Sequence, residues 1–257
     1  MITLAATLAA TLAAPVRAQS ADASIAAGDR SYAVLEAADA LAHYERAATA
    51  DTLSYEAAWK ASRSAADLEP RARGAGARHA AILQKAESHA RRAVALRGDG
   101  AEGHFALSRA LGVAARSKGT RDRVRYASNV RHHALECLRY DPGYSGCLHI
   151  MGAWNAEVMR LSGVERFIAR RLLGGRAFGT ASWSEAIRYM EAAVAAAPGR
   201  IVHRTELAEI YAERGRPADA RREYEAALRL DVSDYNDSLY KASARAALDR
   251  MGEAQRP

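Results

Sequence analysis

Two segments near the C-terminus repeat one spacing of small and bulky apolar residues, 34 positions apart. The matched residues are Ala186, Met190, Ala193 and Pro198 in the first segment and Ala220, Tyr224, Ala227 and Val232 in the second. A period of this length is typical of the tetratricopeptide helix-turn-helix unit. Because one such helix pair cannot bury its apolar face alone, the repeat predicts a stack of pairs.

The turn inside the second segment has residues suited to ending one helix and starting another. Gly215 follows the face formed by Leu207, Ala208 and Tyr211, and glycine adopts the left-handed conformation that ends many helices. Pro217 fits the first turn of the next helix, where its missing N–H costs nothing. We therefore expect one helix to end near Gly215 and its partner to begin at Pro217.

Composition and periodicity extend this interpretation to the whole chain. Of the 257 residues, 49% are apolar, and few stretches have the alternation of a strand. The sequence predicts an all-α fold, a tetratricopeptide-like α-solenoid of antiparallel helix pairs, as a single domain over residues 19–257. The finer expectations are a turn at Gly28-Asp29, a helix from Tyr55 to Leu68 anchored by Trp59, a break from Glu69 to Gly76, a basic helical insertion over residues 163–182 and a capping helix at about 235–248.

The first eighteen residues have the pattern of a secretory signal. An apolar stretch from Leu4 to Ala14 precedes Pro15, and Val16 and Ala18 suit the positions before a cleavage site. We expect residues 1–18 to be a signal peptide and the mature chain to be exported, to the periplasm. No later stretch of about 18 apolar residues predicts a membrane-spanning helix.

Two cysteines lie on either side of a predicted turn. Cys137 precedes Pro142 and Cys147 follows it by the same number of residues, so antiparallel helices would bring both thiols to one height. Two alternatives stay open, a disulfide in an oxidising compartment or two buried free thiols. No paired cysteine or histidine spacing predicts a metal site, and no motif predicts a cofactor.

The net charge of +7 arises mainly from arginine. One interpretation is an anionic partner, since guanidinium groups bind carboxylates and phosphates. The other, which we favour, is a set of solvated helix faces, because Glu and Asp alternate with Arg along the chain. No run of basic residues interleaved with aromatics predicts nucleic-acid binding.

Several segments are more specific than the repeat itself. They are the LHIMGAW segment at Leu148–Trp154, the ERFIARRLL segment at Glu165–Leu173, the AIRY segment at Ala186–Tyr189 and the segment from Glu56 to Ala66. Together they resemble the regulator of microtubule dynamics family, over about Leu35 to Leu230. The chain departs from the family pattern at Gly174-Gly175-Arg176. The resemblance implies an all-helical interaction fold and no catalytic residues, and an exported chain would not meet microtubules.

First helices of tetratricopeptide pairs line a concave face, so their non-core residues are candidate partner contacts. Helical periodicity selects the candidates Lys60, Ser64, Glu102, Phe105, Arg109, His149, Thr205 and Glu209. Such a mixed set suits a peptide or protein partner, with Lys60 and Arg109 clamping a carboxylate. The alternative is a solvated face without a ligand, and His149 is expected to be a packed or hydrogen-bonded residue rather than a catalytic one.

The predicted insertion has a basic amphipathic pattern. Arg166, Arg170 and Arg171 alternate with apolar residues that include Phe167. Such a helix would contact an anionic membrane surface or a partner, or would pack its apolar side on a neighbouring repeat.

No sequence motif supports catalysis. There is no nucleophile elbow, zinc-protease motif, phosphate loop or dinucleotide fingerprint. We therefore predict a non-enzymatic interaction scaffold that binds a protein or peptide in its concave groove. The alternatives are an envelope transport or assembly component that docks on the membrane through the insertion, and an enzyme with an unrecognised site.

Overall fold

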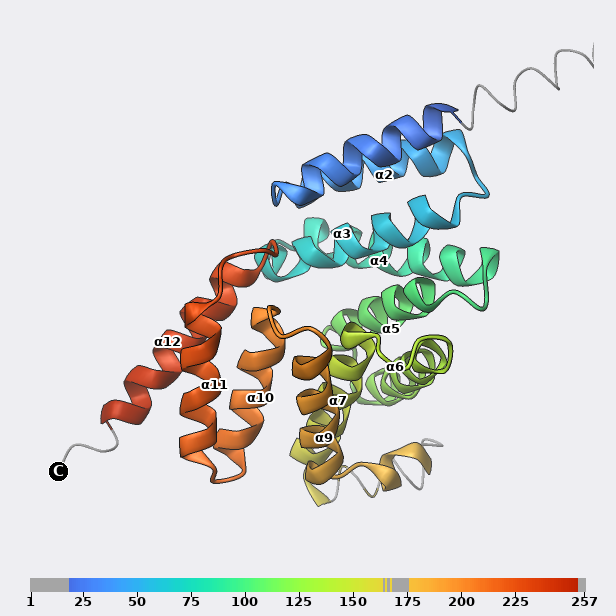
Figure 1. The fold of residues 1–257 in the computed structure, drawn as a ribbon. Helices are drawn as coiled ribbons and strands as arrows, with labels where there is room; N and C mark the ends of the chain where they lie inside the picture. The colour runs from blue at the N-terminus through green and yellow to red at the C-terminus, as the bar shows by residue number, and fades with distance from the viewer. Residues whose placement is uncertain (1–18, 164, 166, 168–175, 254–257) are drawn as a thin grey trace, which may run out of the picture. The chain divides into compact units, whose positions relative to one another are not determined.

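A computed structural model of the chain describes residues 19–163, 165, 167 and 176–253. All regular structure within these residues is helical, as Figure 1 shows, which confirms the predicted fold class. The helices are residues 19–33, α2 (Ala37–Ala50), α3 (Tyr55–Ala72), α4 (Ala77–Leu96), α5 (Ala101–Ala115), α6 (Thr120–Tyr140), α7 (Ser145–Arg160), α9 (Trp183–Ala196), α10 (Ile201–Glu213), α11 (Pro217–Arg229) and α12 (Asp237–Glu253), with a short 3-10 helix η1 (Arg176–Thr180).

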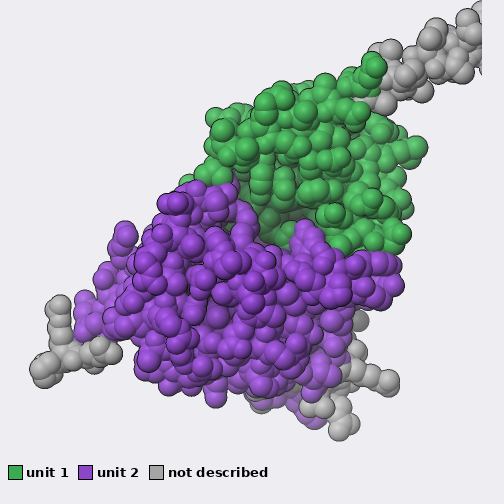
Figure 2. Space-filling model, in the orientation of Figure 1, with its two compact units in different colours: residues 1–110 green, residues 111–257 purple. Residues whose placement is uncertain are grey.

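The chain divides into two compact units, residues 1–110 and residues 111–257, coloured separately in Figure 2. In unit 1, α2 packs on α3 and α3 packs on α4. In unit 2, α6 packs on α7, α7 on α9, α9 on α10, α10 on α11, and α12 on both α10 and α11. The boundary between the units falls inside α5.

Helix starts and ends follow from local chemistry. The Ser54 side chain accepts a hydrogen bond from the Ala57 N–H and so caps α3. Ser182 caps α9 in the same way, through the Glu185 N–H. Gly215 has a φ of 69° and Pro217 begins α11, so the sequence prediction for this turn is confirmed.

Small residues let the helices of unit 2 approach closely. Ala186, Met190 and Ala193 of α9 are fully buried, as the repeat predicts. Opposite them on α7, a Cβ added to Gly152 would lie 2.9 Å from the Met190 Cε atom and 3.2 Å from the Ala186 carbonyl oxygen. A side chain at position 152 would therefore force α7 and α9 apart.

Two expected helix boundaries in unit 1 are wrong. Gly28 and Asp29 lie inside the first helix, which ends near Ala33, and Gly28 serves close packing instead of a turn. The helix that begins at Tyr55 continues to Ala72 and includes Pro70. Pro70 lies in its last turn, where the missing N–H removes only one helical hydrogen bond. The break is confined to residues 73–76, where Gly74 and Gly76 have positive φ.

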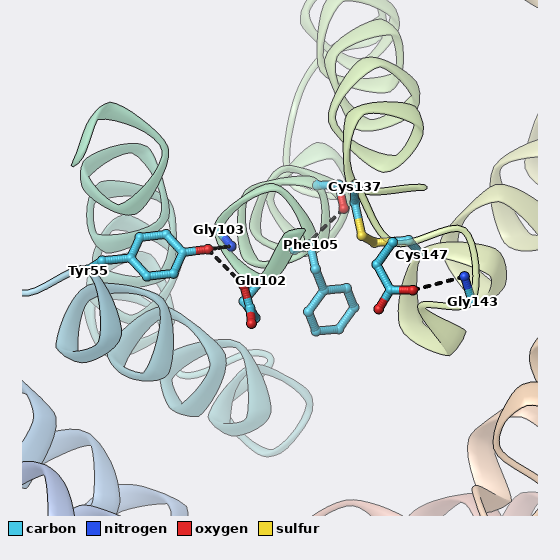
Figure 3. Close-up of a disulfide and its surroundings, with 9 residues drawn as sticks. Tyr55, Glu102, Gly103, Phe105, Cys137, Gly143 and Cys147 are labelled. Atoms are coloured by element: carbon cyan, nitrogen blue, oxygen red, sulfur yellow. Dashed lines mark hydrogen bonds between the residues drawn. A yellow bond between two sulfur atoms is a disulfide. The ribbon is translucent and has the colours of Figure 1, made fainter. Parts of the chain in front are cut away.

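Cys137 of α6 and Cys147 of α7 form a disulfide with an S–S distance of 2.05 Å (Figure 3). The turn between the two helices is held by the Asp141 carboxylate, which accepts a hydrogen bond from the Gly143 N–H at 3.0 Å. Of the two alternatives for these cysteines, the structure shows the disulfide.

The C-terminal helix α12 lies where we expected a capping helix and starts two residues later than predicted. The Asp237 carboxylate caps its first turn by accepting hydrogen bonds from the Ser233 and Asp234 N–H groups, at 2.9 and 2.8 Å. Part of the predicted insertion, at residues 164, 166 and 168–175, lies outside the described residues.

Candidate functional site

In a tetratricopeptide stack the first helix of each pair forms the inner face. In unit 1 these helices are residues 19–33, α3 and the part of α5 that ends at Ala110. In unit 2 they are α7 and α10, followed by α12 at the position of a further first helix. The inner face of each unit is described separately below.

The ammonium group of Lys60 is already bound on the inner face of unit 1. It donates hydrogen bonds to both carboxylate oxygens of Asp29, at 2.7 and 2.8 Å, and pairs with Glu56 at 2.6 Å. Although burial raises the pKa of Asp29, the hydrogen bonds from Lys60 and Tyr44 hold it below its ordinary value. Lys60 is buried, so its predicted place in an open groove is wrong.

Arg109 is likewise bound by its own chain. Its guanidinium donates to the Asp67 carboxylate at 2.7 Å, and the Tyr32 hydroxyl donates to the other oxygen of Asp67 at 3.1 Å. Asp67 is only 1% exposed. The predicted clamp of Lys60 and Arg109 on a partner carboxylate is therefore filled by carboxylates of the same chain.

Ser64 is fully buried at 0% exposure, which also contradicts its predicted place in the groove. It lies between Lys60 and Asp67 on the side of α3 that is bonded to the helix of residues 19–33. The open side of α3 carries Trp59 and Arg63 instead, and both side chains are half-buried.

Trp59 and Arg63 belong to an aromatic and cationic cluster that the sequence analysis missed. The Arg63 guanidinium lies 3.6 Å from the centroid of the Tyr32 ring and 5.0 Å from that of Trp59. Treating Trp59 as a core anchor rotated the predicted face of α3 away from the true one. The spacing of Glu56, Trp59 and Arg63 along one helical side is the signal that would have found it.

Glu102 and Phe105 remain half-buried on α5, as Figure 3 shows. Glu102 accepts a hydrogen bond from the Tyr55 hydroxyl at 3.0 Å, and that hydroxyl accepts one from the Gly103 N–H at 2.7 Å. A Cβ at Gly100 would lie 2.1 Å from the Tyr55 hydroxyl oxygen, so glycine is required there. These contacts join α3 to α5 within unit 1.

His149 of α7 meets His203 of α10 on the inner side of unit 2. Their Nδ1 atoms are 3.1 Å apart, so one imidazole donates to the other. Burial lowers the pKa of His203 to about 2, which keeps this ring neutral. The pair joins two first helices, in agreement with the hydrogen-bonded role expected for His149.

Thr205 is 2% exposed, and its hydroxyl donates to the Ile201 carbonyl of its own helix, so it cannot line an open groove. The half-buried and exposed side of α10 instead carries a stripe of four residues, Val202, Glu206, Glu209 and Glu213. Sequence analysis found Glu209 but missed Glu206 and Glu213. The buried arc of α10 is wide because this helix packs on α7, α9, α11 and α12.

The carboxylates of this stripe differ in their partners. Arg160 of α7 binds Glu213 at 2.7 Å and also pairs with Glu157 of its own helix. Glu206 and Glu209 form neither an ion pair nor a hydrogen bond within the described part of the chain. Burial raises the pKa of Glu206 to about 7, with a further contribution from Glu209, and burial also raises the pKa of Glu209.

The three arginines of the predicted insertion, Arg166, Arg170 and Arg171, lie outside the residues whose side chains are described. Their neighbour Phe167 is described and is 59% exposed. No described helix is both long and apolar enough to cross a bilayer. Among the same residues, no cluster of three or more acidic, histidine or cysteine side chains is arranged to hold a metal ion.

Comparison with known proteins agrees with this architecture. The family model for regulator of microtubule dynamics protein 1-3 matches residues 20–252. A thermophilic tetratricopeptide protein of Thermus thermophilus has 21% identity and a TM-score of 0.64, over 88% of this chain and 99% of its own. The pilF protein of Pseudomonas aeruginosa has 14% identity and a TM-score of 0.54, over 91% and 93%. None of the curated proteins compared with the chain matches it.

Proposed function

The chain belongs to the regulator of microtubule dynamics protein 1-3 family, and on this premise we propose that it is a non-enzymatic interaction scaffold. It holds a peptide or protein segment on the inner face of unit 2, between α7, α10 and α12. The observation that carries the proposal is the stripe Val202, Glu206, Glu209 and Glu213, whose middle two carboxylates have no partner within the described residues.

The location within the fold also supports a binding role. First helices of stacked pairs present their side chains side by side, which suits an extended segment or another helix. Glu157 and Arg160 of α7 face the same stripe, because Arg160 bonds across to Glu213. Two helices therefore contribute polar groups to one surface.

Panning a random peptide display library on the purified chain tests this function. Enriched peptides would be assayed by fluorescence anisotropy against wild type and Val202→Arg, which places a long charged side chain in the stripe. The matched control is Val232→Arg, because Val232 is 48% exposed outside the stripe. We expect affinity to fall about tenfold in Val202→Arg only. Failure to enrich any peptide, or equal binding by all three proteins, would contradict the function.

A second candidate function is peripheral docking on an anionic membrane, as part of an envelope transport or assembly system. It is favoured by the exposed Phe167 within a segment that also contains Arg166, Arg170 and Arg171. Flotation with anionic liposomes should recover the wild type but not Arg170→Glu/Arg171→Glu. The exposed pair Arg139→Glu/Arg188→Glu gives the same charge change as a control. Equal recovery of all three proteins would rule out this docking.

We also propose that the chain is exported and cleaved after Ala18. The support is the apolar stretch before Pro15 and the Cys137–Cys147 disulfide, since disulfides persist in oxidising compartments. N-terminal sequencing of the protein from a periplasmic extract should start at Gln19. An intact Met1 on protein recovered from the cytoplasm would disprove export.

A further inference from the structure

Two features set Glu206 and Glu209 apart from the other carboxylates near them. They lie three residues apart on α10 and are half-buried, so water screens them incompletely. The neighbouring Glu213 has a bidentate partner in Arg160, with hydrogen bonds of 2.7 to 3.1 Å. In the described part of the molecule, Glu206 and Glu209 have no such partner.

A buried hydroxyl reaches the same place from α11. Tyr224 is 3% exposed, and its hydroxyl has no hydrogen-bond partner among the described residues. Other buried tyrosines of the chain are bonded to carboxylates, Tyr44 to Asp29 at 2.7 Å and Tyr211 to Glu191 at 2.5 Å. A buried hydroxyl normally finds a partner, so the exception at Tyr224 calls for one.

Electrostatics place the Tyr224 hydroxyl beside the acidic stripe. Burial, and next to it the charge of Glu209, raise the pKa of Tyr224 to about 12. Glu213 and Glu206 act in the same direction, and Arg250 of α12 opposes them. The phenol therefore points toward Glu206 and Glu209, from the side of α11.

We propose that Glu206, Glu209 and the Tyr224 hydroxyl form a recognition site for one positively charged side chain, arginine or lysine, of the bound segment. The inference rests on the function proposed above and specifies the chemistry of the partner. A guanidinium presents several N–H donors, which suit two carboxylates and a hydroxyl oxygen. A metal ion fits less well, since the described carboxylates do not cluster closely enough to coordinate one.

The surrounding charges limit what else can fill this site. Arg160 of α7 is committed to Glu157 and Glu213. Arg116, which follows α5, acts on Glu206, and Arg250 acts on Glu209, but neither forms an ion pair with these two carboxylates. A cation from the partner would meet ionised carboxylates above the pKa of Glu206, which is about 7, so binding should strengthen as pH rises through that value.

Two pools of short random peptides test the proposal. The pools differ only at one fixed central position, which is arginine in one and its uncharged isostere citrulline in the other. Retention of each pool on the immobilised chain at pH 8 should favour arginine by about tenfold. The preference should disappear in Glu206→Gln/Glu209→Gln, decrease in Tyr224→Phe, and remain in the matched control Glu225→Gln/Glu253→Gln.

Two further measurements keep the test sharp. The arginine preference should decrease from about pH 8 to about pH 6 in wild type, because Glu206 becomes protonated. Arg250→Gln should keep or increase the preference, and its loss in that variant would show that Arg250 is part of the site and overturn the proposal. Thermal unfolding of each variant verifies that it is folded.

The outcomes separate this inference from the function on which it rests. Equal retention of both pools, abolished by Val202→Arg, would leave the scaffold function standing and overturn the cation site. Retention of neither pool would overturn both. An arginine preference that survives Glu206→Gln/Glu209→Gln would place the cation elsewhere and also overturn the proposal.

Discussion

The inner faces of the two units solve the same electrostatic problem in different ways. In unit 1, Lys60 is bonded to Asp29 and Arg109 to Asp67, so each buried or half-buried charge has a partner from the same chain. In unit 2, Arg160 neutralises Glu213 and Glu157, but Glu206 and Glu209 keep their charges unpaired within the described residues. A surface that is internally neutralised maintains the fold, and a surface with unsatisfied groups is available to a ligand.

The difference also shows why residue type alone misidentifies a binding site. Basic residues on first helices suggested a carboxylate clamp in unit 1, and the structure fills that clamp with Asp29 and Asp67. A charge pair across neighbouring helices costs desolvation for both groups, so its role is to stabilise one packing arrangement. The balance of partners, rather than the count of charges, distinguishes the two faces.

The largest effect should come from breaking a pair in unit 1. Asp67→Ala leaves Arg109 and the Tyr32 hydroxyl without their carboxylate in a buried setting. We expect the free energy of unfolding, measured by urea denaturation, to fall by about 3 kcal/mol. Glu209→Ala in unit 2 should cost far less, and equal costs would remove the contrast between the units.

The covalent link in unit 2 should rank next. Cys137→Ser/Cys147→Ser opens the loop that the disulfide closes around the turn between α6 and α7. Loop-closure entropy predicts a loss of about 2–3 kcal/mol. Hydrogen exchange should increase in α6 and α7 more than in α3 and α4. A uniform increase over both units would show that they do not respond separately.

Neutralising Glu206 should stabilise the protein at high pH. Its folded pKa of about 7 lies above the ordinary value, so the stability present at low pH is lost as pH rises through 7. Glu206→Gln removes this loss and should gain about 1 kcal/mol at pH 8, with almost no difference near pH 4. Denaturation at both pH values measures the effect, and a destabilised Glu206→Gln at pH 8 would contradict it.

The smallest effect, of opposite sign, belongs to unit 1. Hydrogen bonds from Lys60 and Tyr44, outweighing the larger effect of burial, lower the pKa of Asp29. Its contribution is therefore present above the ordinary carboxyl value and lost as pH falls through the lowered one. Asp29→Asn should destabilise by less than about 1 kcal/mol at pH 7, because Asp29 is partly exposed. The gap to wild type should close in strong acid, which pH-dependent denaturation measures.

The sequence predicted the helix pairs well because their signals are local. Ala186, Met190 and Ala193 recur with the helical period, and Gly215 and Pro217 mark a turn by their own backbone preferences. Such features depend on neighbours within a few residues along the chain. They do not require knowledge of which helix lies opposite.

The candidate site was predicted less well because exposure is a tertiary property. Thr205 is buried because α10 has neighbours on several sides, which narrows its open stripe to four residues. Lys60 and Ser64 are covered because the helix of residues 19–33 bonds to their side of α3. Glu206 has no feature in the sequence that separates it from the many paired glutamates, and only the arrangement of α7, α10 and α11 does so.

Gly28 connects backbone shape to charge at a distance. A Cβ there would lie 2.5 Å from the Tyr44 ring, and the hydroxyl of that ring donates to Asp29, the residue that holds Lys60. An alanine at position 28 would push the ring aside and weaken the grip of the phenol on the carboxylate. A mutation that adds one methyl group and no charge would thus be felt as an ionic defect on a different helix.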